Sequence, residues 1–127
     1  MSNAVAEPSV VLVVEDDLLL RMDAVNIVRD AGFDAFEAAN ADEAIAILES
    51  NANIHVVFTD IQMPGSMDGL KLAKFVKDRW PPIKIMATSG LIKISGDDLP
   101  PGGRFLPKPY SPAEVIRTLR ELLANYG

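Results

Sequence analysis

The sequence predicts a single α/β domain in which a five-stranded parallel sheet carries helices on both faces. The first observation behind this prediction is an alternation: short apolar runs rich in β-branched residues are separated by segments with apolar residues at helical spacing. Such alternation is typical of parallel sheets that are covered by helices. The second observation is size, since 127 residues, 49% hydrophobic and 24% charged, suit one folded domain.

Five segments are predicted as strands. The runs Val10–Asp16 and Ile54–Asp60 are apolar along most of their length, as strands buried on both faces of a sheet are. Ile83–Gly90 and Arg104–Lys108, which have shorter apolar stretches, are further candidates. Asp34–Ala38 is more polar, which is typical of a strand at the edge of a sheet. Together these runs supply the strands of the predicted sheet.

Helical patterns lie between these runs. In the first, four apolar residues recur at helical spacing: Leu20, Ala24, Ile27 and Ala31. Asn40 and Glu43 resemble a capping box at the start of the second helix. The third helix ends at the sequence WPP. The last has Ser111 as its cap, Pro112 in its first turn and Glu114 three residues after the cap.

Composition and the first residues of the chain narrow the class of protein. Because there is no cysteine, disulfides and thiolate metal sites are excluded. A net charge of −6 disfavours direct binding of nucleic acid or of an anionic membrane. No apolar run could span a membrane, and the start MSNAVAEPS lacks the pattern of a signal peptide. We therefore expect residues 1–9 to be a flexible tail, residues 10–126 to form the domain, and the location to be cytoplasmic.

Polar residues follow four of the predicted strands at the point where each strand ends. They are Glu15, Asp16 and Asp17, then Asp60, then Thr88 and Ser89, and finally Lys108. In an open parallel sheet, ligands bind beyond the carboxyl ends of the strands. We therefore expect carboxylates, a hydroxyl and an ammonium group at one edge of the sheet, apart from Asp17, which is better suited to cap the first helix.

The chemistry of this edge follows from the residue types. Carboxylates held close together repel each other, so the cluster needs raised pKa values or a hard cation. Mg²⁺ (or Mn²⁺) fits, because it binds a few protein oxygens and keeps water or phosphate oxygens as its other ligands. A carboxylate can also attack phosphorus and form an aspartyl phosphate. The cation, the lysine and the hydroxyl would then neutralise the phosphoryl oxygens.

Four segments of the sequence resemble the signature segments of response regulator receiver domains of the CheY-like superfamily: VVEDD, TDIQMPGSMDG, ATSG and FLPKP. The resemblance runs from about Val10 to Tyr126. It implies a flavodoxin-like fold with strand order 2-1-3-4-5. It also implies a stand-alone phospho-accepting switch of a two-component or phosphorelay system, which is no enzyme beyond assisting its own phosphorylation and dephosphorylation.

The same resemblance implies roles for the acidic residues and the lysine. Asp60 is expected to accept phosphate from a phosphohistidine on a sensor histidine kinase or a histidine phosphotransfer protein. Glu15, Asp16 and Asp60 are expected to hold Mg²⁺ together with the backbone carbonyl of Gln62. Lys108 is expected to contact the phosphoryl group. The signal would leave through an unknown output protein or by relay of phosphate.

The resemblance also implies a switch. Ser89 matches the family's switch hydroxyl because the small Gly90 follows it, and Thr88 is the alternative. Phe105 matches the aromatic residue that changes rotamer on activation. A cis bond before Pro109 is expected to help aim the preceding lysine.

Two other functions are compatible with part of this pattern. A Mg²⁺-dependent hydrolase that forms an aspartyl phosphate would usually need a second acid two residues after the nucleophile, where this chain has Gln62. It would also need a cap over the substrate, for which there is little room. A pseudo-receiver that only binds partners is the other alternative, and the complete set of site residues argues against it.

One segment departs from the regular alternation. Residues Leu91–Gly103, LIKISGDDLPPGG, have little helical periodicity, and Pro100 and Pro101 close the pattern. We expect at most a turn or two of helix near Leu91–Ser95. We hypothesise that this segment, with Phe105 and the last helix, faces a partner and orders on phosphorylation or binding. A permanently flexible connector is the alternative.

Overall fold

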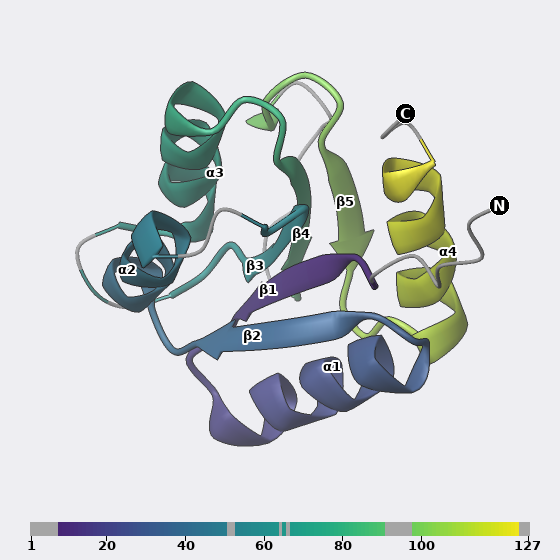
Figure 1. The fold of residues 1–127 in the computed structure, drawn as a ribbon. Coiled ribbons are helices and arrows are strands. Elements are labelled where there is room, and N and C mark those ends of the chain that lie inside the picture. Colours follow the sequence, from purple (N-terminus) through teal and green to yellow (C-terminus); the bar gives the residue numbers. More distant parts are fainter. Residues whose placement is uncertain (1–7, 51–52, 64, 66, 91–97, 125–127) are drawn as a thin grey trace, which may run out of the picture.

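The computed structural model describes residues 8–50, 53–63, 65, 67–90 and 98–124. One parallel sheet has the strand order β2-β1-β3-β4-β5, with α1 and α4 on one face and α2 and α3 on the other (Figure 1). The strands are β1 (Val10–Val14), β2 (Asp34–Ala38), β3 (Val56–Asp60), β4 (Lys84–Ser89) and β5 (Arg104–Pro107). The helices are α1 (Leu18–Asp30), α2 (Ala41–Ser50), α3 (Gly69–Arg79) and α4 (Pro112–Leu123). The predicted fold class and strand order are confirmed.

The apolar runs form inner strands because both of their faces are covered. Val13 and Phe58 belong to the core under α1 and α4, whereas Val14 and Val57 belong to the core under α2 and α3. All five residues of β3 are buried. Successive side chains of a strand point to opposite faces, so only a continuously apolar run satisfies both cores.

The predicted stripe of α1 is only partly right. Ala24 and Ile27 are buried, as expected, but Leu20 is 42% exposed. The reason lies in the start of the helix. Asp17 caps α1 by accepting a hydrogen bond from the Leu20 backbone N–H at 3.0 Å, so Leu20 lies in the first turn. The helix meets the sheet only from its second turn onward, and its first turn extends beyond it.

The other predicted caps can be compared directly with the structure. Ser111 and Glu114 form the reciprocal capping box of α4, with bonds of 3.1 and 2.9 Å. Asn40 accepts from the Glu43 N–H at 2.8 Å, but the Glu43 carboxylate accepts from the N–H of Ala39 rather than from that of Asn40. The start of α2 is therefore capped as predicted, with the return bond displaced by one residue.

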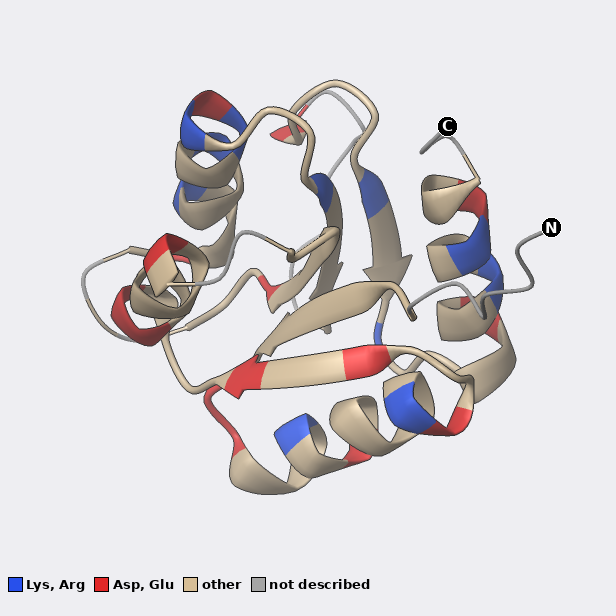
Figure 2. Ribbon diagram, in the orientation of Figure 1, with Lys and Arg blue, Asp and Glu red and all other residues tan. Residues whose placement is uncertain are grey.

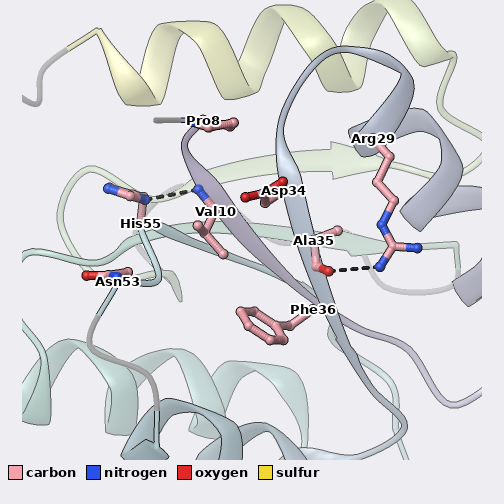
Figure 3. Close-up of a pocket in the computed structure, with 8 residues that line it drawn as sticks. All are labelled: Pro8, Val10, Arg29, Asp34, Ala35, Phe36, Asn53 and His55. Atoms are coloured by element: carbon pink, nitrogen blue, oxygen red, sulfur yellow. Dashed lines mark hydrogen bonds between the residues drawn. The ribbon is translucent and has the colours of Figure 1, made fainter. Parts of the chain in front are cut away.

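The starts of β1 and β2 and the segment before β3 line a hollow of about 630 Å³ (Figure 3). The His55 Nδ1 atom accepts a hydrogen bond from the Val10 N–H at 3.0 Å and so fixes the start of β1. Arg29 donates from Nη2 to the carbonyl oxygen of Ala35 on the outermost strand at 3.0 Å. His55 thus makes a structural hydrogen bond at the edge of the sheet opposite to the strand ends where the acidic residues lie.

The connection between β4 and β5 is described only in its second half. In residues 98–103, Leu99 is buried in the core under α2 and α3, and the Gly103 N–H donates to the Pro100 carbonyl at 2.9 Å in a turn. No α-helix forms within this part. The helical turn expected near Leu91–Ser95 and most of the expected tail lie outside the described residues. None of the helices in the described ranges is long and apolar enough to cross a membrane.

Candidate functional site

Three carboxylates meet at the carboxyl end of the sheet. Glu15 directly follows β1 and is 5% exposed, and Asp60 is the last residue of β3 and is 7% exposed. Asp16 is exposed, and one carboxylate oxygen of each residue lies within 4.8 Å of the others. Figure 2 shows acidic segments where β1 leads into α1 and at the end of β3. The predicted acidic residues are therefore brought together, at a spacing that suits one shared cation.

Lys108 joins two of these carboxylates. Its Nζ atom donates to Glu15 Oε1 at 2.9 Å and to Asp60 Oδ2 at 3.0 Å. The side chain extends from the loop after β5, where the Lys108–Pro109 bond is cis, as expected. The Lys108 N–H donates to the Ser89 carbonyl at 3.0 Å, so the loop still follows the edge of β4. A residue far along the chain thus reaches the acidic pair.

Backbone groups orient the same carboxylates. The Gln62 N–H donates to Asp60 Oδ1 at 3.2 Å, and the Asp17 N–H donates to Glu15 Oε2 at 3.1 Å. With the two bonds from Lys108, each buried carboxylate has a donor on each of its oxygens. Both carboxylates are therefore held in one orientation, which leaves oxygen lone pairs free to face the cluster.

The charges of the site are unbalanced. Three carboxylates and one ammonium group leave a formal charge of −2 on these four side chains. Burial raises the pKa of Glu15, the neighbouring charge of Asp60 adds to the rise, and the bonds from Lys108 and the Asp17 N–H oppose it. Burial would lower the pKa of Lys108, but its bonds to Glu15 and Asp60 outweigh burial, and its pKa is raised. The site therefore attracts a further positive charge.

The two candidate hydroxyls lie on opposite faces of β4. Ser89 is buried and its Oγ donates to the side-chain oxygen of Gln62 at a long 3.4 Å. Thr88 lies beside Asp60 in the strand register and is also buried. Its Oγ1 has no hydrogen-bond partner among the described residues. Which of the two contacts a phosphoryl group stays a prediction.

Phe105 lies on the same face of the sheet as Ser89. It pairs in register with Ala87, two residues before Ser89, and packs partly buried against the core under α2 and α3. Side chains two residues apart on a strand share a face. Phe105 is therefore within one row of the predicted switch hydroxyl, as their expected coupling requires.

Two residues of the site were not found from the sequence. Gly69 opens α3 and lies so close to the backbone of Asp60 and Ile61 that an added Cβ would collide with both. Tyr110 follows the loop of Lys108, and its ring packs on Phe58 at 5.7 Å between centroids. A glycine shortly after the acidic strand was the available signal for Gly69. For Tyr110, an aromatic residue just before a helix, the sequence offers no signal that places it at the site.

The first turn of α1 exposes a group of large apolar side chains beside the acidic cluster. Leu19 is 76% exposed, and the others are about half exposed: Leu18, Leu20 and Met22. Scattered apolar residues on a surface are ordinary, but four within five positions form a patch, which is a feature of contact surfaces. We call these four residues the α1 patch.

Known proteins are similar to this chain in sequence. A family model described as response regulator receiver domain matches residues 11–120. The sensor kinase CckA of Brucella abortus (strain 2308) is 34% identical over 117 residues, which are 89% of this chain and 12% of that protein. The aerobic respiration control protein ArcA of Escherichia coli (strain K12) is 31% identical over 124 residues, 91% of this chain and 48% of that protein. The chain thus spans less than half the length of either relative.

Solved structures of receiver proteins are similar to this chain in fold. A response regulator receiver protein from Sinorhizobium medicae WSM419 superposes with a TM-score of 0.87 at 28% identity, covering 95% of this chain and 98% of that one. The receiver domain of the hybrid histidine kinase CckA superposes with a TM-score of 0.78 at 30% identity, covering 90% and 98%. Sequence and fold therefore point to the same set of proteins.

Proposed function

This chain belongs to the response regulator receiver domain family, and from that premise we propose that it is a signalling switch whose phosphoacceptor is Asp60. One observation carries the assignment of the residue. Asp60 is the buried carboxylate at the end of the central strand β3, bonded to Lys108 and within 4.8 Å of Glu15 and Asp16. Glu15 shares the burial and the bond to the ammonium group, but among the three clustered carboxylates of the described chain Asp60 is the one on the central strand.

The proposed reaction is the transfer of a phosphoryl group from a phosphohistidine to Asp60. A carboxylate oxygen of Asp60 attacks phosphorus, a P–O bond forms, and the P–N bond to the donor imidazole breaks with its electron pair on nitrogen. Lys108 and the Gln62 N–H already orient the carboxylate. The ammonium group of Lys108 is then placed to stabilise charge on the transferred oxygens.

We propose that Glu15, Asp16, Asp60 and the backbone carbonyl of Gln62 hold Mg²⁺ or Mn²⁺. The residues fit such an ion, because three oxygen ligands converge and the site carries excess negative charge. The bound ion would supply positive charge opposite the phosphoryl oxygens. Its binding also relieves the repulsion between Asp16 and the two buried carboxylates.

In the same proposal, Ser89 and Phe105 are the two residues whose side chains change position on phosphorylation. The Ser89 hydroxyl would turn from its long bond with Gln62 toward a phosphoryl oxygen, and the Phe105 ring would turn into the space released. The support is their shared face, one row apart. The 3.4 Å bond is weak and is therefore easily exchanged.

We propose that the partner that delivers phosphate is a sensor histidine kinase or a phosphotransfer protein, and that it docks on the α1 patch. The patch begins at Leu18, two residues after Asp16 of the acidic cluster, so a partner bound to it brings its phosphohistidine beside Asp60. Apolar residues next to a charged reaction centre supply contact area without adding to the charge repulsion between partner and site.

The phosphoacceptor is tested by intact mass after incubation with acetyl phosphate and Mg²⁺. The wild type should gain one phosphoryl group, which survives acid and is removed by hydroxylamine. Asp60→Asn should gain none. Asp34→Asn is the matched control, because Asp34 begins the outermost strand at the opposite edge of the sheet, and it should label like the wild type. Full labelling of Asp60→Asn would show that another residue is the acceptor.

A further inference from the structure

The hydroxyl of Thr88 is an exception among the buried hydroxyl groups of the described core. Thr59 and Thr118 donate to backbone carbonyls at 2.9 and 2.8 Å. Thr88 is 3% exposed, yet its Oγ1 has no partner within the described chain. A buried hydroxyl without a hydrogen bond is costly, and nearly all such groups in folded proteins are satisfied. Thr88 therefore requires a partner that the chain itself does not supply.

A small void lies where that partner would be. It measures about 10 Å³, which is room for a single water molecule. Four apolar residues line it: Val13, Val14, Ala24 and Phe58. Four polar side chains complete the lining: Glu15, Asp60, Thr88 and Tyr110. A buried water needs two to four polar partners, and this lining offers that number.

The polar groups share the void because of strand alternation. Glu15, Asp60 and Thr88 lie at the carboxyl ends of β1, β3 and β4. Each is two positions after Val13, Phe58 or Met86, which all belong to the core under α1 and α4, so each points to that same face. Tyr110 reaches the void from the loop after Lys108, with its ring on Phe58. Burial raises the pKa of Tyr110, so its phenol keeps its proton and remains a donor.

The hydrogen-bonding capacity of these groups matches one water. The hydroxyls of Thr88 and Tyr110 can each donate to the water oxygen, and the water can donate one hydrogen to Glu15 and one to Asp60. Each carboxylate has spare lone pairs for this bond, because Glu15 accepts only from Lys108 and Asp17, and Asp60 only from Lys108 and Gln62 among the bonds described.

We propose that Thr88 and Tyr110 are positioning residues for the phosphoacceptor: together they hold one internal water against the carboxylates of Glu15 and Asp60. The water gives Asp60 a third fixed bond, in addition to those from Lys108 and the Gln62 N–H. It also ties the end of β4 to the loop that carries Lys108. The inference rests on the proposed function of Asp60 only where it predicts reactivity.

The presence of the water is tested by a high-resolution crystal structure of the wild type, Thr88→Val and Thr88→Ser. The wild type and Thr88→Ser, which keeps the hydroxyl, should contain an ordered water within hydrogen-bond distance of Asp60 and the Tyr110 hydroxyl. Thr88→Val, which keeps the shape and removes the hydroxyl, should lose it. A dry void in the wild type overturns the inference whatever the chemistry of the site.

Its role in positioning is tested by the rate of phosphorylation with acetyl phosphate at saturating Mg²⁺. Thr88→Val and Tyr110→Phe should lower the maximal rate by about five- to tenfold, the effect of one lost hydrogen bond, while the half-saturating donor concentration stays unchanged. Thr88→Ser should restore the rate. Wild-type rates in Thr88→Val overturn the positioning role. A wild type that does not label at all would instead overturn the proposed function, while the crystal structure still decides the water.

Discussion

Replacing Lys108 by methionine tests how much its positive charge stabilises the buried carboxylates of the acidic cluster. The substitution keeps most of the side-chain volume and removes the two bonds of 2.9 and 3.0 Å to Glu15 and Asp60. The side chains of both carboxylates are less than 10% exposed and that of Lys108 is 20% exposed, so water replaces the lost bonds poorly. Removing one partner of such a cluster leaves buried charges without compensation.

The size of the effect follows from these contacts. Two charged hydrogen bonds in a mostly buried setting predict that Lys108→Met lowers the free energy of unfolding by about 2–4 kcal/mol in EDTA. For a domain of this size, that corresponds to a fall in melting temperature of roughly 10 °C. The formal charge of the cluster changes from −2 to −3, so Mg²⁺ should bind the variant more tightly. Each tenfold gain in affinity adds about 1.4 kcal/mol to the stabilisation by excess Mg²⁺.

The assay is thermal and urea unfolding of both proteins, in EDTA and in a series of Mg²⁺ concentrations. Lys71→Met is the matched control, because Lys71 is exposed on α3 and its side chain has no described bond, and it should unfold like the wild type in both conditions. Equal stability of Lys108→Met and wild type in EDTA would refute the reasoning. So would a stabilisation by Mg²⁺ that is no larger in the variant than in the wild type.

Three further predictions concern the surroundings of the site. Gly69→Ala should lower the free energy of unfolding by about 2–4 kcal/mol and slow the labelling of Asp60, because the new Cβ would collide with the Asp60 backbone. The control is Gly90→Ala, whose Cβ would lie 3.5 Å from Lys108. In urea unfolding it should change the free energy of unfolding by less than about 1 kcal/mol. Ser89→Ala should still accept phosphate, but a fluorinated phenylalanine at position 105 should no longer change its NMR shift when beryllofluoride is added; an unchanged response would exclude the coupled switch. Hydrogen bonds from the Ser111 N–H and hydroxyl hold the pKa of Glu114 below its usual 4.5, so this group stabilises the fold above pH 4.5 and loses that contribution as pH falls through its lowered pKa. Glu114→Gln should therefore lose less thermal stability on acidification than the wild type, and parallel curves would contradict this.

The fold was predictable because its central strands leave little choice. A run such as Val56–Phe58, buried on both faces, must be apolar throughout, and this pattern can be recognised in one sequence. The polar residues after each strand were likewise predictable as neighbours, because parallel strands end at one edge. Which strand lies next to which came from the resemblance to a family rather than from the residues themselves.

Other features depend on contacts that no local pattern encodes. Lys108 bonds to Glu15, 93 positions earlier, and the sequence predicted only that both lie at the same edge. The exposure of Leu20 was missed because helical spacing does not say how far a helix extends past its sheet. Gly69 and Tyr110 were missed because each lies outside the strands and acts through close contact with a residue of β3. Gly69 contacts Asp60, and Tyr110 contacts Phe58.

The bond from Arg29 to the Ala35 carbonyl has a consequence for how this molecule can meet others. An outermost strand offers backbone groups with which a strand of another molecule can pair, and charged side chains are a common protection. Here the guanidinium occupies one carbonyl of β2, and the ion pair of Arg21 with Glu37 at 3.1 Å lies two residues further on. A strand that pairs with this carbonyl would have to displace the guanidinium. Addition of a strand from another molecule is thus opposed at this point of β2, and the same guanidinium also joins α1 to the edge of the sheet.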